Sequence, residues 1–134
     1  MQLIEICSKK AFEILKSENE SYLIDVRTEY EWTTIGVPNL EKINKKVLFI
    51  PWPNLVDMEF AKYFLNILKS RFNYNNKLFF ICRSGSRSKL ASEIAVNNNF
   101  SNCYNIIDGF EGNRTDEMKI GWKLQDLPWV FMKN

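Results

Sequence analysis

The sequence predicts an α/β fold: a mainly parallel sheet of about five strands, covered by helices on both faces. Short apolar runs alternate along the chain with stretches whose apolar residues recur at helical spacing. Residues 22–26 show little polar alternation, which is typical of a strand buried on both faces. No repeat, low-complexity tract or linker interrupts this pattern, so residues 1–134 are expected to form one domain.

The expected strands are short apolar runs bounded by polar or turn residues. They cover residues 3–6, 22–26, 47–50, 78–81 and 103–107. Residues 51–53, Pro-Trp-Pro, close the third strand because proline cannot continue a ladder. Residues 36–39 contain a glycine and a proline and are predicted to be a turn.

The expected helices carry apolar residues every three or four positions. They cover residues 8–16, 29–32, 57–70, 90–95 and 117–125. The pattern is clearest in 57–70, where Phe60, Phe64 and Ile67 share one face. Ser8 is a plausible N-cap for the first helix.

Composition and charge exclude several classes of protein. A hydrophobic content of 46% with 25% charged residues is ordinary for a soluble globular domain. The net charge of +2, with no basic stripe, argues against a nucleic-acid or membrane-surface role. No apolar run approaches the roughly 18 residues that cross a bilayer, and the N-terminus lacks the pattern of a secretory signal. A cytoplasmic protein is expected.

The chain has three cysteines and no histidine. Cys7, Cys82 and Cys103 have the spacing of neither a disulfide framework nor a metal motif. The absence of histidine removes His-assisted nucleophiles and imidazole general bases. Any catalysis must therefore use a cysteine activated by its electrostatic surroundings, and no metal or organic cofactor is expected.

Cys82 is the candidate nucleophile, because it stands where the strand at 78–81 passes through a short loop to a helix. Backbone N–H groups at a helix N-terminus lack intrahelical partners and the macrodipole there is positive, so the loop can hold an anion. Arg83 and Arg87 add two positive charges, and Gly85 lets the backbone bend inward. We expect Cys82 to be a thiolate at neutral pH.

At these residues the chain resembles the rhodanese-like sulfurtransferase family. The sequence CRSGSRS at residues 82–88 matches that family's active-site loop almost letter for letter. Residues 23–32 resemble its first signature, and residues 106–112 and 121–129 resemble its closing segment. One departure concerns Gly36, near which the family commonly has Gly-His-Ile: the histidine is missing here, which bears on the shape of that loop and on substrate access.

The resemblance implies a rhodanese-like three-layer fold and sulfur transfer through a persulfide on Cys82. The donor would be a small sulfur-containing anion such as thiosulfate, and the acceptor cyanide or a thiol, including a protein thiol. The other loop residues are expected to bind the substrate: Arg83, Ser84, Gly85, Ser86, Arg87 and Ser88. One arginine should bind and activate while the other forms a salt bridge that shapes the loop, and the sequence leaves their order open. The protein would be a monomer or homodimer.

Two other functions compete with this one. A cysteine phosphatase also has a loop from Cys to Arg, but it needs five intervening residues, whereas four separate Cys82 from Arg87. A persulfide carrier or binding module that serves a protein partner would have the same loop as the enzyme, so the sequence does not separate these two.

Several further residues have two possible roles. Ser86 or Ser88 is alternatively an ordinary N-cap. Cys7 and Cys103 are expected to be small buried hydrophobes on strands, with a resolving thiol as the alternative for Cys103.

Residues near the ends of the strands are expected to support the loop. Asp25, Arg27 and Glu31 should form structural pairs and caps at the sheet's carboxyl edge. By resemblance, residues 109–110 should lie beside the loop, where Phe110 either walls the pocket or closes the core.

Overall fold

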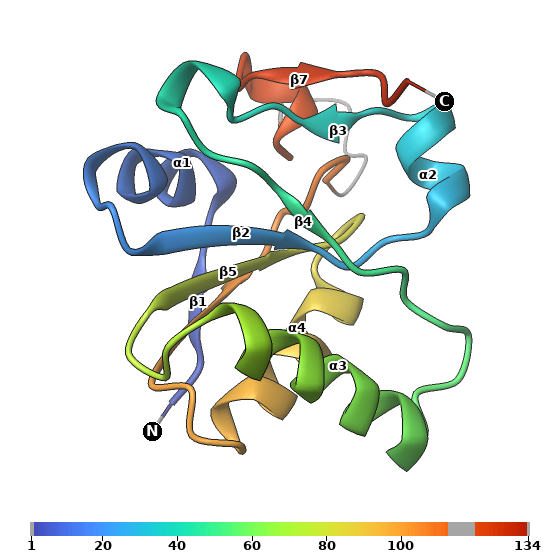
Figure 1. Ribbon diagram of the computed structural model, residues 1–134. Coiled ribbons are helices and arrows are strands. Elements are labelled where there is room, and N and C mark those ends of the chain that lie inside the picture. The colour runs from blue at the N-terminus through green and yellow to red at the C-terminus, as the bar shows by residue number, and fades with distance from the viewer. Residues whose placement is uncertain (1, 113–119, 134) are drawn as a thin grey trace.

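The computed structural model describes residues 2–112 and 120–133. Its centre is a five-stranded sheet in the order β1-β6-β5-β2-β4, in which every neighbouring pair is parallel (Figure 1). The strands are β1 (Ile4–Ile6), β2 (Ser21–Asp25), β4 (Leu48–Phe49), β5 (Lys77–Ile81) and β6 (Asn102–Ile106). The five strands predicted from the sequence are therefore confirmed, each to within a residue or so at its ends.

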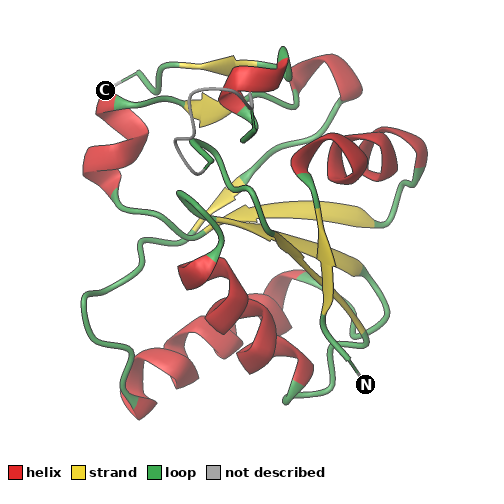
Figure 2. Ribbon diagram, turned by 180° about the vertical axis from the view of Figure 1, so that it is seen from behind, coloured by secondary structure: helices red, strands yellow, loops and turns green. Residues whose placement is uncertain are grey.

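Helices cover both faces of the sheet, as the alternating pattern predicts (Figures 1 and 2). They are α1 (Ser8–Ser17), α2 (Glu29–Thr34), α3 (Met58–Arg71) and α4 (Ser86–Val96), with 3₁₀ turns η1 (Glu41–Ile43) and η2 (Lys123–Gln125). Helix α1 lies on one face, and α3 and α4 lie on the other. None of the described helices is long and apolar enough to cross a bilayer.

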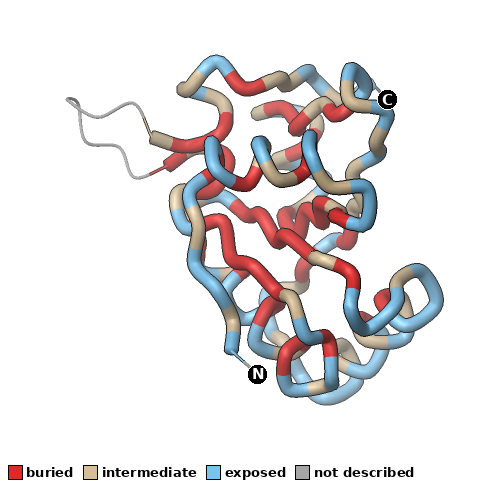
Figure 3. Tube along the Cα trace, turned by 90° about the vertical axis from the view of Figure 1, so that its left-hand side faces the viewer, coloured by how far each residue is buried: buried red, intermediate tan, exposed pale blue. Residues whose placement is uncertain are grey.

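Alternate residues of β5 supply the two halves of the core. Leu78 and Phe80 pack with α3 and α4, whereas Phe79 and Ile81 pack with α1, because successive side chains of a strand point to opposite faces. All four are fully buried, and burying each contributes roughly 1.5–3 kcal/mol. Figure 3 shows the buried trace at the centre and exposed residues on the outer turns. Continuing this alternation, Cys82 joins the core on the α3–α4 side.

The predicted turn at residues 36–39 is wrong in part, because this segment contains a strand. Strand β3 (Val37–Pro38) pairs antiparallel with β7 (Trp129–Val130). Gly36 leads into β3 with φ +119°, and a Cβ there would lie 2.7 Å from the ring of Trp129. A proline is tolerated because β3 belongs to a two-stranded ladder that leaves one edge of each strand free.

Two further predictions change at helix ends. The helix expected at 117–125 falls partly on residues outside the described ranges, and its described part contains only the short 3₁₀ turn η2. Ser8 lies inside α1, and Cys7 is the N-cap. The Ser8 N–H and hydroxyl both donate to the carboxylate of Asp108, at 2.8 and 2.7 Å. Asp108 therefore supplies the acceptor that an N-cap side chain normally provides.

Candidate active site

The loop between β5 and α4 curls around the sulfur of Cys82, as the strand–loop–helix pattern predicts. The Gly85 N–H donates to Cys82 Sγ at 3.2 Å. Gly85 is the N-cap of α4 and has φ +105°, and a Cβ at this position would lie 2.5 Å from the carbonyl oxygen of Ile107. Only glycine fits this close approach. The sulfur therefore faces the positive end of α4. Because Cys82 is 1% exposed, water competes little with this interaction.

Ser88 provides a second polar contact to the same sulfur. Its hydroxyl lies 3.1 Å from Cys82 Sγ and donates to Asn105 Oδ1 at 2.6 Å. The alternative that Ser86 or Ser88 caps the helix is wrong, since Gly85 occupies the N-cap and Ser86 begins α4. Asn105 was not predicted as a site residue. The available signal was a polar side chain inside an otherwise apolar parallel strand, where polar groups need a partner.

Arg87 fastens the loop to α2. Its guanidinium forms two hydrogen bonds with Glu31, at 2.6 and 2.9 Å. These bonds raise the pKa of Arg87, with smaller contributions from the negative charges of Cys82 and Asp25. Burial raises the pKa of Glu31, but the hydrogen bonds and charge of Arg87 outweigh that effect and hold it below its usual value. Arg87 is thus the loop arginine that forms the shaping salt bridge.

Arg83 points outward from the loop. Its side chain is 53% exposed, and its Nε lies 3.5 Å from Glu111 Oε2. The backbone beside it is packed closely, since a Cβ on Gly109 would lie 2.3 Å from the Arg83 carbonyl oxygen. The N–H of Phe110 also donates to the Cys82 carbonyl at 2.8 Å. The expectation that residues 109–110 lie beside the loop is therefore confirmed.

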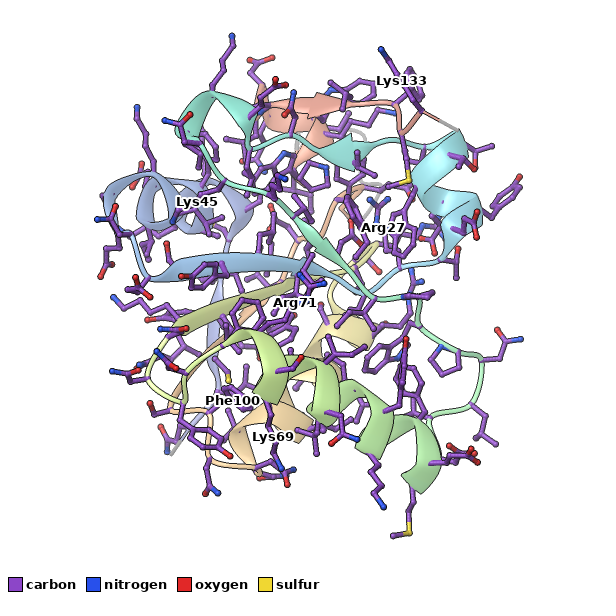
Figure 4. The ribbon with its side chains drawn as sticks, in the orientation of Figure 1. Arg27, Lys45, Lys69, Arg71, Phe100 and Lys133 are labelled. Carbon is purple, nitrogen blue, oxygen red and sulfur yellow. The ribbon has the colours of Figure 1, made fainter. Side chains whose placement is uncertain are left out.

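Asp25 and Arg27 form a fully buried ion pair next to the loop, with 2.7 Å between Arg27 Nη2 and Asp25 Oδ2. The same Nη2 donates to the carbonyl of Gly36 at 2.9 Å. The guanidinium lies 4.3 Å from the centre of the Phe110 ring, inside the body of the protein (Figure 4). Phe110 therefore closes the core, and the prediction of structural pairs is confirmed. The predicted cap is confirmed as well, because Glu31 forms a capping box with Thr28 at the start of α2.

The other two cysteines differ from each other. Cys103 is fully buried on β6, and burial raises the pKa of its thiol to about 12. This protonated thiol behaves as a small hydrophobe, as predicted. The same prediction for Cys7 is wrong, because Cys7 is exposed and stands at the start of α1. The apolar residues before it belong to a strand that ends at Ile6.

The loop places the Gly85 N–H and the Ser88 hydroxyl beside the buried sulfur of Cys82, at the positive end of α4. Such a site stabilises negative charge on sulfur, and therefore suits a thiolate that attacks as a nucleophile and is later released as an anion. Within residues 2–112 and 120–133, His, Cys, Asp and Glu side chains form no group of three that could hold a metal ion.

Comparisons with known proteins identify the family of the chain. Residues 4–134 match the family model described as STR4 middle domain. An uncharacterized protein of Rickettsia conorii is 43% identical over 131 residues, which cover 98% of this chain and all of that protein. The chloroplastic rhodanese-like domain-containing protein 4 of Arabidopsis thaliana is 28% identical over 128 residues. That match covers 94% of this chain but only 25% of the plant protein.

Solved structures share the fold. The crystal structure of Rv0390 from M. tuberculosis aligns with a TM-score of 0.82 at 33% identity, over 96% of this chain and 97% of that one. The polysulfide-sulfur transferase homodimer of Wolinella succinogenes aligns with a TM-score of 0.69 at 21% identity, over 96% of this chain and 78% of that one. At the latter identity the likeness concerns the fold alone.

Proposed function

This chain belongs to the rhodanese-like family, and from that membership we propose that it is a sulfurtransferase that works through a persulfide on Cys82. The observation that carries the proposal is the contact of the Gly85 N–H with Cys82 Sγ, at 3.2 Å, at the N-terminus of α4. A donor placed there stabilises a thiolate and also the negative sulfur of a persulfide.

The proposed reaction has two steps. The Cys82 thiolate attacks the outer sulfur of a donor such as thiosulfate, so that a Cys82–S–S⁻ persulfide forms while the S–S bond of the donor breaks and sulfite leaves with its electron pair. An acceptor such as cyanide or a thiolate then attacks the terminal sulfur, and the thiolate of Cys82 is released. The negative charge passes between sulfur atoms, so no proton relay is required.

The two loop arginines take different roles in this proposal. Arg87 is held by Glu31 and keeps the loop in place, while Arg83 is half exposed and offers its charge to an approaching anion. Ser84 is half-buried and Ser86 is exposed on the same loop, and in this proposal their N–H groups and hydroxyls bind the donor.

A cysteine phosphatase is disfavoured by the loop's dimensions. Four residues separate Cys82 from Arg87, one fewer than a phosphate-binding ring of that kind needs. Cys82 is also only 1% exposed, which suits a slender chain of sulfur atoms better than a tetrahedral phosphate with three oxygens around the attacked atom.

The test is intact-protein mass after incubation with thiosulfate, followed by cyanide. We expect the protein to gain one sulfur mass and to lose it again with cyanide, and we expect Cys82→Ser to gain none. Cys7→Ser is the matched control, because Cys7 is the exposed cysteine and its replacement should leave the gain unchanged. A gain that survives in Cys82→Ser contradicts the proposal. A gain on Cys82 that cyanide does not remove identifies a persulfide carrier instead.

A further inference from the structure

The hydroxyl of Ser88 stands between two hydrogen-bond acceptors but has one hydrogen to give. Cys82 Sγ lies 3.1 Å from the Ser88 oxygen, and Asn105 Oδ1 lies 2.6 Å from it. All three residues are buried, with Asn105 1% exposed, so solvent water is not freely available to satisfy whichever acceptor is left out.

The orientation of the Asn105 amide is determined by its other contacts. Its Nδ2 donates to the Gly85 carbonyl and to Glu5 Oε2, both at 3.1 Å. Both partners are acceptors, so the amide nitrogen must point toward them and Oδ1 must face Ser88. The strand register supports this arrangement, because Asn105 of β6 stands opposite Glu5 of β1. Oδ1 can only accept a hydrogen bond, and therefore competes with the sulfur of Cys82.

We propose that Asn105 is a positioning residue for sulfur transfer: it draws the Ser88 hydrogen away from Cys82 Sγ and so favours the persulfide over the free thiolate. The inference rests on the proposed role of Cys82. While Cys82 is a thiolate, the Ser88 hydroxyl donates to Sγ and leaves Asn105 Oδ1 without its hydrogen. Once Sγ is bonded to the second sulfur, it is neutral and no longer demands a donor.

In the persulfide state the Ser88 hydroxyl returns to Asn105 Oδ1, while the terminal sulfur carries the charge. The hydroxyl rotates without transferring a proton, so the charge balance of the two sulfur-transfer steps is unchanged. The state of Cys82, which follows β5, is thereby linked to the hydrogen bonding of Asn105 on the neighbouring strand β6.

Charged groups around this chain of hydrogen bonds are the same in both states. Arg87, on α4, is near enough for the Cys82 charge to raise its pKa. It is bound to Glu31. Glu5, on β1, contacts Asn105, and its other oxygen lies 3.9 Å from Lys89 Nζ. A variant of Asn105 also removes the Nδ2 hydrogen bonds to the Gly85 carbonyl and to Glu5. A change in thiol ionisation is therefore assigned to the Ser88 hydrogen only where it disappears when Ser88 is replaced.

The test is a double-mutant cycle on the pH profile of Cys82 alkylation by iodoacetamide, in a Cys7→Ser background. In Asn105→Leu the Ser88 hydrogen is committed to the sulfur, so the alkylation midpoint should fall by roughly 0.5–1 pH unit, a 3- to 10-fold change in ionisation. Ser88→Ala removes the donor and should raise the midpoint. Adding Asn105→Leu to Ser88→Ala should then cause no further shift.

Two outcomes overturn the inference: an unchanged or raised midpoint in folded Asn105→Leu, or an equal fall with and without Ser88. Circular dichroism checks folding, and if Asn105→Leu does not fold, Asn105→Ala removes the same acceptor with less bulk and is held to the same outcomes. With limiting thiosulfate, the ratio of persulfide to free Cys82 measured by mass should also fall 3- to 10-fold in the folded variant. The alkylation measurement does not depend on sulfur transfer, so it tests the inference about Asn105 by itself. A wild-type protein that gains no sulfur mass contradicts the proposed function instead.

Discussion

Replacing Gly109 with alanine tests how firmly the segment after β6 holds the active loop. Gly109 has φ +60°, and an added Cβ would lie 2.3 Å from the Arg83 carbonyl oxygen and 2.7 Å from the Ser84 nitrogen. Both neighbours are backbone atoms, so no side-chain rotation relieves the contact. The backbone that must yield is the one that carries the Gly85 N–H to Cys82 Sγ.

The expected cost has two parts. A left-handed conformation costs a non-glycine residue roughly 1–2 kcal/mol, and forcing one extra carbon against fixed neighbours costs roughly 1–3 kcal/mol. The sum, about 2–5 kcal/mol, is a large share of the 5–15 kcal/mol that is typical of a domain. Gly109→Ala should still fold, with a Tm roughly 6–20 °C lower. Persulfide formation on Cys82 should slow at least about tenfold, because small displacements of a binding loop are costly.

Urea unfolding and thiosulfate-dependent mass gain measure the two effects. Asn99→Ala is the matched control: Asn99 has φ +77°, is exposed and already carries a Cβ. This variant places alanine in a left-handed conformation without a new Cβ pressed against backbone atoms. Its free energy of unfolding should therefore fall by at most about 1 kcal/mol, and its persulfide yield should equal that of the wild type. The reasoning is refuted if Gly109→Ala loses no more stability than Asn99→Ala, or if it keeps the wild-type rate of sulfur uptake.

Two more predictions concern pairs away from the sulfur. Glu31→Gln should lower the free energy of unfolding at pH 7 by about 1–2 kcal/mol, since its partner Arg87 is half-buried. The folded pKa of Glu31 lies below the ordinary 4.5, so this difference should be complete above about pH 4.5 and vanish as the pH falls through the folded value. Urea unfolding at several pH values checks this, and an equal difference at pH 3 would contradict it. Lys45→Met should lower the free energy of unfolding by about 2–3 kcal/mol. The Lys45 ammonium, which lies beside α1 in Figure 4, donates at 2.6–2.8 Å to two carbonyls and one hydroxyl of the segment that follows this helix. Urea unfolding measures both changes: Lys46→Met, at an exposed neighbour, should lower the free energy of unfolding little, and equal losses in the two variants would refute this assignment.

The sequence predicted those parts of the fold that depend on local pattern. Five apolar runs became five strands, and the spacing of Phe60, Phe64 and Ile67 located α3. Strands β3 and β7 were not predicted. Their pairing joins Val37 to Val130, and no local propensity encodes a contact between such distant segments.

The candidate site was also predicted only in those parts that depend on local pattern. The order of cysteine, glycine and arginines in one loop identified the candidate nucleophile and its helix. The pairing of Arg87 with Glu31, and of Ser88 with Asn105, depends on which elements the sheet order brings together. Residue types alone give no partner for a charge or an amide, so the sequence left the roles of the two arginines open and gave no signal strong enough to select Asn105.

The parallel pairing of β1 with β6 has a consequence for how the chain folds during synthesis. Ile4 of β1 pairs with Tyr104 of β6, so β1 has no neighbour in the sheet until β6 has also emerged from the ribosome. At roughly 5–20 residues per second, that interval lasts several seconds. The nascent domain must therefore carry an unpaired strand through most of its translation, and its central sheet can be completed only late.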